Sequence, residues 1–362
     1  MRLEPVDLFV PGRLCLFGEH SDWAGALRVS DPSIPPGRCL IAGTDQGVLA
    51  TASPLEGYFE LGQPGPDGSP APLFRSPADP DLLRSVAVSA GFESYAAGVA
   101  CLVLERHPGA GVRIDVRERT LPLAKGLSSS AAICVLTARA FSRACSLGFT
   151  VEEEMDLAYR GELLTGSSCG RMDQACAYGS VTVELTFDGD SMGVGSVSPG
   201  CDMHMLIADL GASKDTRRIL SDLGAAFSAG DPGIRRALGA CNQDILSRAI
   251  HHLESGDAEA LGALMTEAQE VFDRFVAPCS AALASPALHC VLAHPASLAL
   301  AWGGKGVGSQ GDGSAQFLCR GPEEREELSR RLSLLPGVSC LSLTLRSGRF
   351  LVSDASDASP SC

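Results

Sequence analysis

The chain has 362 residues, of which 45% are hydrophobic and 20% charged, and its net charge is −14. This composition is enough for a large buried core, and it excludes disorder over most of the chain. The length predicts about two domains. The acidic balance argues against a nucleic-acid partner, because phosphate contacts need clustered Lys and Arg.

Fourteen cysteines are scattered along the chain, and none of them forms a C-x-x-C pair. Several lie in apolar neighbourhoods, for example Cys39, Cys134 and Cys290. We therefore predict mostly buried, free thiols in a reducing compartment. The first residues lack a signal-peptide pattern, and no uncharged apolar run reaches the ~18 residues of a membrane span. The sequence predicts a cytoplasmic protein with no membrane partner.

The first half of the chain is predicted to contain strands followed by helices. Residues 7–18 are typical of two short strands joined by a Pro-Gly turn, and residues 38–52 of two strands broken at Gly43 and Gly47. Residues 62–82 are rich in Pro, Gly and Asp and are predicted to form a surface loop. The further expected elements are a strand at 112–123, a helix from residue 131, a helix at 151–165 and strands at 181–187 and 203–211.

The second half is predicted to be mostly helical from 214 to 285 and to return to strands near the end. The elements expected there are a strand at 297–302, a glycine-rich loop, a strand at 314–320, a helix at 322–334 and a strand at 339–346. Strands and helices in runs, rather than in strict alternation, favour an α+β fold. We expect one domain over residues 1–200, a second over 201–350 and a polar tail over 351–362.

Two short motifs suggest functions that their surroundings contradict. Residues 166–170 spell G-x-S-x-G, but a predicted helix precedes them, whereas the hydrolase nucleophile turn follows a strand. Residues 306–311 spell G-x-G-x-x-G, but a predicted strand follows, whereas a dinucleotide site needs a helix there. The Walker motif GxxxxGK[ST] and the zinc motif HExxH are both absent from the sequence.

The segment LAKGLSSSAA (123–132) has the pattern of an anion site, because a predicted strand leads in and an apolar-periodic helix leaves. Free backbone N–H groups at a helix start, together with the helix dipole, bind anions. Gly126 allows close approach of a phosphate, and the three following serines carry hydroxyls for phosphate oxygens or magnesium. A simpler interpretation is a serine that only caps the helix.

Arg13, Glu19, His20 and Asp22 crowd the segment VPGRLCLFGEHSDWAG (10–25). Carboxylates and an imidazole can bind the hydroxyls of a polyol, so this segment is a candidate sugar cradle; the alternative is an ordinary solvated loop.

A pair of acids forms the third candidate feature. Glu162 is expected on a helix and Asp173 at a turn eleven positions later, beyond a Gly/Ser-rich break. One of them could hold a metal while the other meets a substrate hydroxyl.

Taken together, the segments PGRLCLFGEHSDWAG, LPLAKGLSSSAA, GRMDQACAYG and WGGKGVGSQGDGSAQFL resemble, in order and spacing over residues 8–320, the GHMP small-molecule kinase superfamily. This superfamily includes galactokinase, homoserine kinase, mevalonate kinase and phosphomevalonate kinase. The first segment lies between the galactokinase and mevalonate kinase forms of its motif, and the third is similar to the galactokinase MDQ segment. The resemblance implies a two-domain α+β fold, with an N-terminal domain like ribosomal protein S5 domain 2 and a ferredoxin-like C-terminal domain.

The resemblance also implies roles for individual residues. Asp173 would orient or deprotonate the attacking hydroxyl, and Arg13 would lie beside it. Ser130 and Glu162 would bind magnesium, and Glu19, His20 and Asp22 would hold sugar hydroxyls. The implied ATP-binding residues are Lys125, Gly126, Leu127, Ser128, Ser129, Ser130, Ala131, Gly304, Gly306 and Gly308.

The function expected from this resemblance is ATP- and Mg²⁺-dependent phosphorylation of a sugar hydroxyl, at the anomeric position, by a monomer or homodimer. Two departures keep alternatives open. Lys305 is inserted among the glycines of the last motif, and ASKDTRRIL (212–220) looks more like mevalonate kinase. The first alternative is a mevalonate kinase-like enzyme in which Lys214, Arg217 or Arg218 meets a carboxylate. The second is a sensor that binds ATP and sugar without catalysis.

Overall fold

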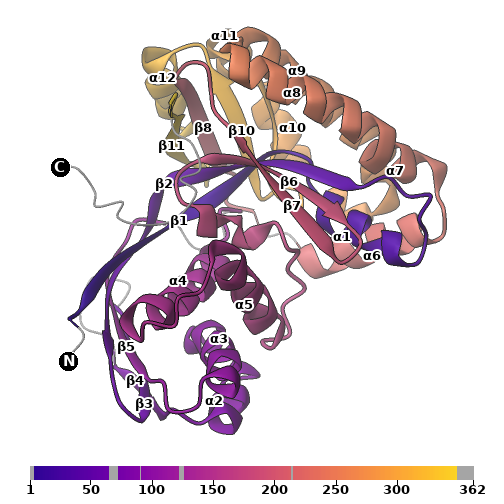
Figure 1. Ribbon diagram of the computed structural model, residues 1–362. Coiled ribbons are helices and arrows are strands. Elements are labelled where there is room, and N and C mark those ends of the chain that lie inside the picture. Colours follow the sequence, from indigo (N-terminus) through magenta and orange to yellow (C-terminus); the bar gives the residue numbers. More distant parts are fainter. Residues whose placement is uncertain (1–3, 65–71, 90, 122–125, 213–214, 349–362) are drawn as a thin grey trace.

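The computed structural model describes residues 4–64, 72–89, 91–121, 126–212 and 215–348. Figure 1 shows two sheets with helices packed against them. The strands are β1 (Val6–Phe17), β2 (Gly37–Pro54), β3 (Tyr58–Gly62), β4 (Phe74–Pro77), β5 (Val112–Arg119), β6 (Thr182–Asp188), β7 (Ser191–Val197), β8 (Met203–Asp209), β9 (Ala301–Gly306), β10 (Ser314–Cys319) and β11 (Ser339–Leu345). The helices are α1 (Ser21–Ala26), α2 (Pro80–Ala87), α3 (Glu93–Arg106), α4 (Ser129–Ala144), α5 (Val151–Leu163), α6 (Thr216–Ser228), α7 (Pro232–Arg236), α8 (Asn242–Ser255), α9 (Ala258–Phe275), α10 (Pro286–Leu292), α11 (Pro295–Leu300) and α12 (Pro322–Leu332).

The first sheet is organised around the long strand β2. Its strand order is β4-β3-β5-β2-β6-β7, and β1 also pairs with β2, antiparallel. Helix α4 packs on β1 and β2, and α3 and α5 pack beside it (Figure 1). The second sheet has the order β11-β8-β10-β9; α9 packs on β9 and α12 on β8. The α+β fold class predicted from the sequence is therefore confirmed.

The two pairs of short strands predicted at 7–18 and 38–52 are in fact two long strands, β1 and β2. Shifts of register at Pro11/Arg13 and Cys15/Phe17 absorb the Pro-Gly step within β1. The glycines of β2 serve close packing rather than a turn. A Cβ on Gly43 would lie 2.0 Å from the Gly179 carbonyl oxygen, and one on Gly47 would lie 2.5 Å from that of Val10.

Two further predicted elements were wrong in part. The expected loop at 62–82 contains β4 and the first residues of α2, which the Asp79 side chain caps; residues 65–71 lie outside the described part. The expected strand at 297–302 is mainly helix α11, with β9 beginning only at Ala301. Pro295 at the helix start and the His294 side chain, which accepts a hydrogen bond from the Ala296 N–H, favour the helix locally.

Other predicted elements are confirmed, including α5, whose first turn is closed by a reciprocal capping box between Thr150 and Glu153. Helix α5 precedes the G-x-S-x-G segment, and β10 follows the G-x-G-x-x-G segment, as expected for two motifs without their usual function. The expected polar tail at 351–362 lies outside the described residues.

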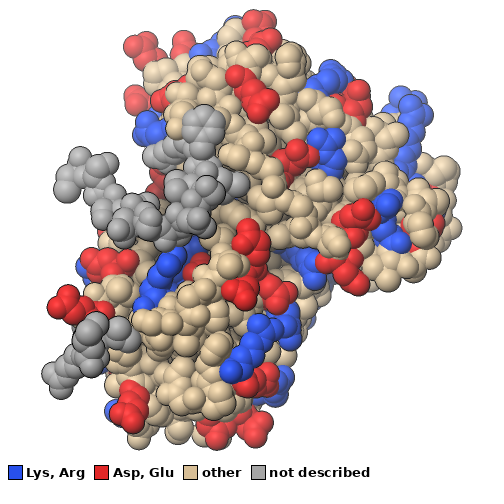
Figure 2. All heavy atoms as spheres, in the orientation of Figure 1, with Lys and Arg blue, Asp and Glu red and all other residues tan. Residues whose placement is uncertain are grey.

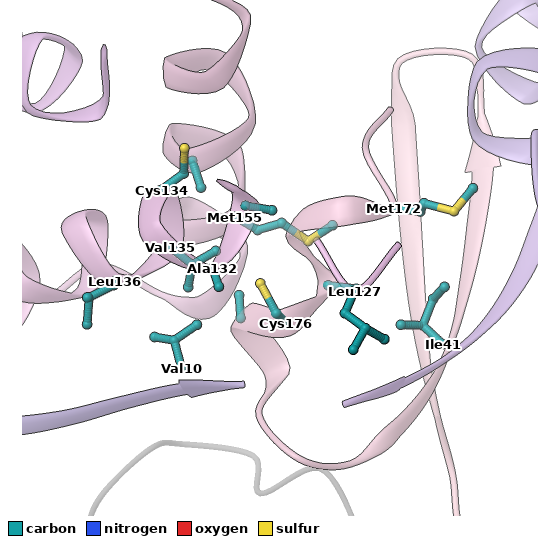
Figure 3. Packing of buried hydrophobic residues seen from close by; sticks show 14 of the residues in the cluster. Val10, Ile41, Leu127, Ala132, Cys134, Val135, Leu136, Met155, Met172 and Cys176 are labelled. Carbon is teal, nitrogen blue, oxygen red and sulfur yellow. The ribbon is translucent and has the colours of Figure 1, made fainter. Parts of the chain in front are cut away.

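The main apolar cluster runs through both sheets, from Val10 on β1 to Met205 on β8 and Leu264 on α9, and separate clusters lie around Phe317 on β10 and around Leu223 on α6. Figure 3 shows Leu127, from the loop before α4, in the main cluster with Ile41 and Cys176. Because this core crosses the expected boundary, the division at residue 200 stays a prediction. Of the cysteines expected to be buried, Cys39 and Cys134 are, whereas Cys290 is exposed on the outer side of α10.

On the face shown in Figure 2, Lys and Arg lie among Asp and Glu. None of the helices in the described ranges is long and apolar enough to cross a membrane.

Candidate active site

A cleft of about 1330 Å³ brings the sequence motifs together. Its walls come from the 19–23 segment, the start of α3, the 126–130 loop, residues 162–173, one face of α6 and the 308–314 loop. The residues that line it include Arg13, Glu19, His20, Asp22, Trp23, Tyr95, Gly126, Ser128, Ser129, Ser130, Glu162, Cys169, Asp173, Arg217, Gly308 and Ser309.

Asp173 lines this cleft, at the start of a short 3₁₀ helix. One of its oxygens, Oδ1, accepts hydrogen bonds from the Arg13 guanidinium and from the Ser128 hydroxyl, the latter at 2.9 Å. The Arg13 guanidinium also donates to the Gly126 carbonyl oxygen at 2.7 Å. The Arg13 backbone N–H donates to the Leu127 carbonyl oxygen at 3.1 Å. Strand β1 therefore holds both the acid and the loop before α4 in place.

Ser128 precedes α4 with left-handed backbone angles (φ 55°, ψ 52°), and its hydroxyl does not cap the helix. The simpler interpretation of a serine cap is therefore wrong at Ser128, because this hydroxyl serves Asp173. The N–H groups of the first turn of α4 are left to bind an anion. Leu127 and Ala131, both expected to bind ATP, are buried and are not among the residues that line the cleft. Lys125 lies outside the described residues.

The second acid, Glu162, is held by two donors. Ser130 Oγ donates to Oε1 at 2.7 Å, and the Gln174 amide donates to Oε2 at 2.9 Å. Burial, followed by the nearby charge of Asp173, raises the pKa of Glu162 to about 7. In the described parts of the chain no group of three or more His, Cys, Asp or Glu side chains is placed to hold a metal. A magnesium ion would therefore need oxygens from a bound phosphate besides those of Ser130 and Glu162, as is usual for Mg²⁺.

The 20–23 segment forms the opposite wall, where α1 begins. The Trp23 Nε1–H donates to His20 Nδ1 at 3.2 Å, and the His20 ring stacks on Phe272 at 6.0 Å between centroids. Asp22 is buried, and burial together with the charge of Asp173 raises the pKa of Asp22 to about 6. A Cβ on Gly170 would lie 1.6 Å from Asp22 Oδ2, so a larger residue there would displace the Asp22 carboxylate.

The last of the expected substrate ligands, Glu19, has a partner that the sequence did not predict. Its carboxylate pairs with the Lys305 ammonium, and both side chains are buried. Of the three glycines expected near the phosphates, only Gly308 lines the cleft. Gly304 and Gly306 lie within β9, and a Cβ on them would meet the Phe317 ring and the Gln310 side chain.

Sequence reasoning did not single out Tyr95, Cys169 or Gln174. Tyr95 reaches the cleft from the first turn of α3, and Gln174 directly follows the predicted Asp173. The MDQ pattern was the only signal for Gln174, since its contact with Glu162 depends on the tertiary fold.

Comparisons with known proteins agree with this geometry. The model of the GHMP kinases N terminal domain matches residues 94–180, which include the loop before α4, Glu162 and Asp173. A galactokinase of Streptomyces coelicolor is 26% identical over 294 residues, covering 71% of each chain. A mevalonate kinase of Aeropyrum pernix is 27% identical over 264 residues, covering 72% of this chain and 74% of its own.

Among solved structures, the fold is similar to that of Leishmania major mevalonate kinase in complex with R-mevalonate, with a TM-score of 0.71 at 17% identity, covering 96% of this chain and 99% of that one. Lactococcus lactis galactokinase complexed with galactose gives a TM-score of 0.70 at 19% identity, covering 95% and 94%. The motifs, the family match and the fold agree: residues 94–180 match the GHMP kinases N terminal domain, and the chain is similar to galactokinases and mevalonate kinases.

Proposed function

We propose that this protein is a sugar kinase of the GHMP superfamily that transfers the γ-phosphoryl group of ATP to the anomeric hydroxyl of a sugar. The observation that carries this proposal is the position of Asp173. It is fixed by Arg13 and Ser128 at the start of α4, between that helix and the His20–Asp22 wall. A donor phosphate at the helix start and an acceptor hydroxyl at Asp173 would then meet in one cleft.

The proposed reaction needs little covalent chemistry from the protein, because phosphoryl transfer depends on positioning and on stabilised charge. The sugar hydroxyl oxygen attacks the γ-phosphorus, its proton passes to the Asp173 carboxylate, and ADP leaves. Arg13 keeps the carboxylate in place and stabilises its charged form. The first-turn N–H groups of α4, with Gly126 (φ 77°) allowing close approach, would bind the phosphates.

Ser130 and Glu162 fit the magnesium ion that such a reaction uses. Both side chains line the cleft beside the helix start, and their oxygens already lie 2.7 Å apart. A bound magnesium would neutralise phosphate charge there. Burial and the charge of Asp173 raise the pKa of Glu162 to about 7, and a bound cation would stabilise its charged form.

The acceptor wall favours a polyhydroxylated substrate. Asp22 offers a carboxyl group, which with its pKa near 6 can accept hydrogen bonds from hydroxyls, and the Trp23 ring beside it offers an apolar face. The protein would be cytoplasmic, and monomeric or homodimeric. A mevalonate kinase-like activity is the second candidate, because Arg217 also lines the cleft and could meet a carboxylate. Arg218 instead faces Asp222 at 3.6 Å, and Lys214 lies outside the described residues.

An ADP-release assay with Mg·ATP tests the proposal against galactose, arabinose, fucose, glucuronate, galacturonate, N-acetylhexosamines and mevalonate. We expect one sugar to be used far better than the rest and its methyl glycoside, which lacks a free anomeric hydroxyl, not to be used. A mevalonate signal would replace the sugar proposal by the second candidate. Nucleotide binding with no transfer to any acceptor would overturn both and favour a sensor.

A further inference from the structure

Lys305 is the next-to-last residue of β9 and is 1% exposed, an unusual place for a lysine. Its ammonium contacts the Glu19 carboxylate and the Gly306 carbonyl oxygen, the latter at 3.3 Å. Glu19 stands two residues after the end of β1, 286 positions away in the chain. A buried ion pair is a weak source of stability, because desolvation offsets most of its attraction. Stability alone therefore does not account for this pair, and we consider what it does for the cleft.

The pair belongs to a buried polar network that joins the two sheets. The Gln316 amide on β10 donates to the Cys15 carbonyl oxygen of β1 at 2.8 Å and to that of Gly306 at 3.3 Å. The Gly306 N–H donates to the Gln269 side chain of α9 at 2.7 Å. The end of β1 and the end of β9 are thus fixed to each other from several sides.

Each of these strand ends continues into one wall of the cleft. The chain after Glu19 carries His20, Asp22 and Trp23, and the chain after Gly306 carries Gly308 and Ser309. The contact between Lys305 and Glu19 is therefore one of the interactions that set the separation between the two walls, and it is the one charged pair among the described contacts. A misplacement of about 1 Å between reacting groups costs roughly a hundredfold in rate, so this separation matters for transfer.

We propose that Lys305 is a positioning residue that fixes the acceptor wall relative to the glycine-rich loop, and that Glu19 serves this ion pair rather than binding a substrate hydroxyl. This inference rests on the proposed kinase function, and it alters one expectation drawn from the family resemblance, that Glu19 holds the sugar.

The two tryptophans of the chain allow a test that needs no substrate. Trp302→Phe leaves Trp23, on the acceptor wall, as the single fluorophore. In this background we would compare Glu19→Gln, Lys305→Met and the double variant. Lys305→Met leaves a buried carboxylate without its cation and can fail to fold. The double variant removes both charges, so it should fold, and it is the variant that tests the proposal.

The matched control is Glu184→Gln. Glu184 on β6 pairs with Arg38 at 2.6 Å, and Arg38 also contacts Gln243 and Ser247 on α8. This ion pair therefore also connects the first sheet to a helix of the second half of the chain. Unlike Glu19, Glu184 does not line the cleft. This variant should lower thermal stability without changing acrylamide quenching of Trp23 or the acceptor KM.

In the double variant we expect acrylamide quenching of Trp23 to rise about twofold and the acceptor KM to rise tenfold or more, with the ATP KM changed less than about threefold. Unchanged quenching and acceptor KM would show a purely structural pair. Glu19→Gln alone could raise the acceptor KM without changing the quenching, while the KM for a sugar that lacks one hydroxyl stays the same as in wild type. In that case Glu19 binds that hydroxyl directly, and the proposal is wrong. If the wild-type protein phosphorylates no acceptor, the proposed function fails, while the quenching data still decide the role of the pair.

Discussion

Arg13 and Asp173 stand 160 positions apart in the chain, yet the guanidinium of one is bonded to the carboxylate of the other in the cleft. The arginine is 7% exposed and the aspartate 21%, so the acid has the better access to a ligand. The same Arg13 also holds the Gly126 carbonyl oxygen, which ties the acid to the loop before α4. One side chain thereby sets the distance between the group that would receive a proton and the site that would hold the phosphates.

Replacing Asp173 by Asn should lower turnover by roughly two to four decades, the range found for loss of a general base. The amide keeps the size of the side chain but cannot take the hydroxyl proton. Asp190→Asn, in the exposed turn between β6 and β7, is the control and should keep full turnover. A loss below tenfold in the ADP-release assay would remove Asp173 from the mechanism.

Glu162→Gln should raise the Mg²⁺ concentration needed for half-maximal activity by about tenfold or more, since it replaces one of two protein oxygens by a neutral amide. Glu152→Gln, exposed on the same helix α5, serves for comparison. Binding of Mn²⁺ with nucleotide, followed by electron paramagnetic resonance, provides a readout independent of turnover. An unchanged Mg²⁺ requirement would contradict the ligand assignment.

The raised pKa of Glu162 also makes the stability of the ligand-free protein depend on pH. Between its ordinary pKa of 4.5 and its native value of about 7, the folded state keeps a proton that the unfolded chain has released. The free energy of unfolding therefore falls as pH rises through this interval. Glu162→Gln lacks this titration, so its Tm relative to wild type should increase from pH 5 to pH 8. Calorimetry without Mg²⁺ or nucleotide measures this, and parallel curves for the two proteins would refute it.

Gly170→Ala should weaken acceptor binding while leaving ATP binding nearly unchanged. The added Cβ would stand 1.6 Å from Asp22 Oδ2, so Asp22 has to leave its position on the acceptor wall. We expect the acceptor KM to rise about tenfold or more, the cost of misplacing a group that positions the substrate. Gly193→Ala on β7, where a Cβ meets only the Thr186 Cβ at 3.8 Å, is the matched control. If the acceptor KM of Gly170→Ala equals that of Gly193→Ala, Asp22 does not bind the acceptor.

The elements and the loop before α4 could be predicted from the sequence because their signals are local. The Thr150–Glu153 capping box marks the start of α5 within four residues, and the small residues after Lys125 mark a turn into a helix. The glycines at 43 and 47 misled the prediction, because glycine serves close backbone packing as well as turns.

The partner of Glu19 could not be read from the sequence, because the contact joins segments 286 positions apart. No periodicity or spacing records which side chain of a distant strand faces a given carboxylate. Lys305 was visible as an extra residue among glycines, but only the pairing of β9 with β10, and the hydrogen bond from Gln316 on β10 to the Cys15 carbonyl oxygen of β1, bring it to Glu19. The same holds for Tyr95, which reaches the cleft through the packing of α3.

The apolar cluster that extends from β1 and α4 into β8 and α9 has a consequence for how the molecule comes apart on heating. A core shared by both sheets cannot be divided without exposing apolar surface on each side, so we expect a single cooperative transition rather than two. A fragment that ends near residue 200 would lack the residues of β8, α8 and α9 that cover one side of this core, and would leave that side in water. On this expectation, the segments that carry the two walls of the cleft are lost in the same transition.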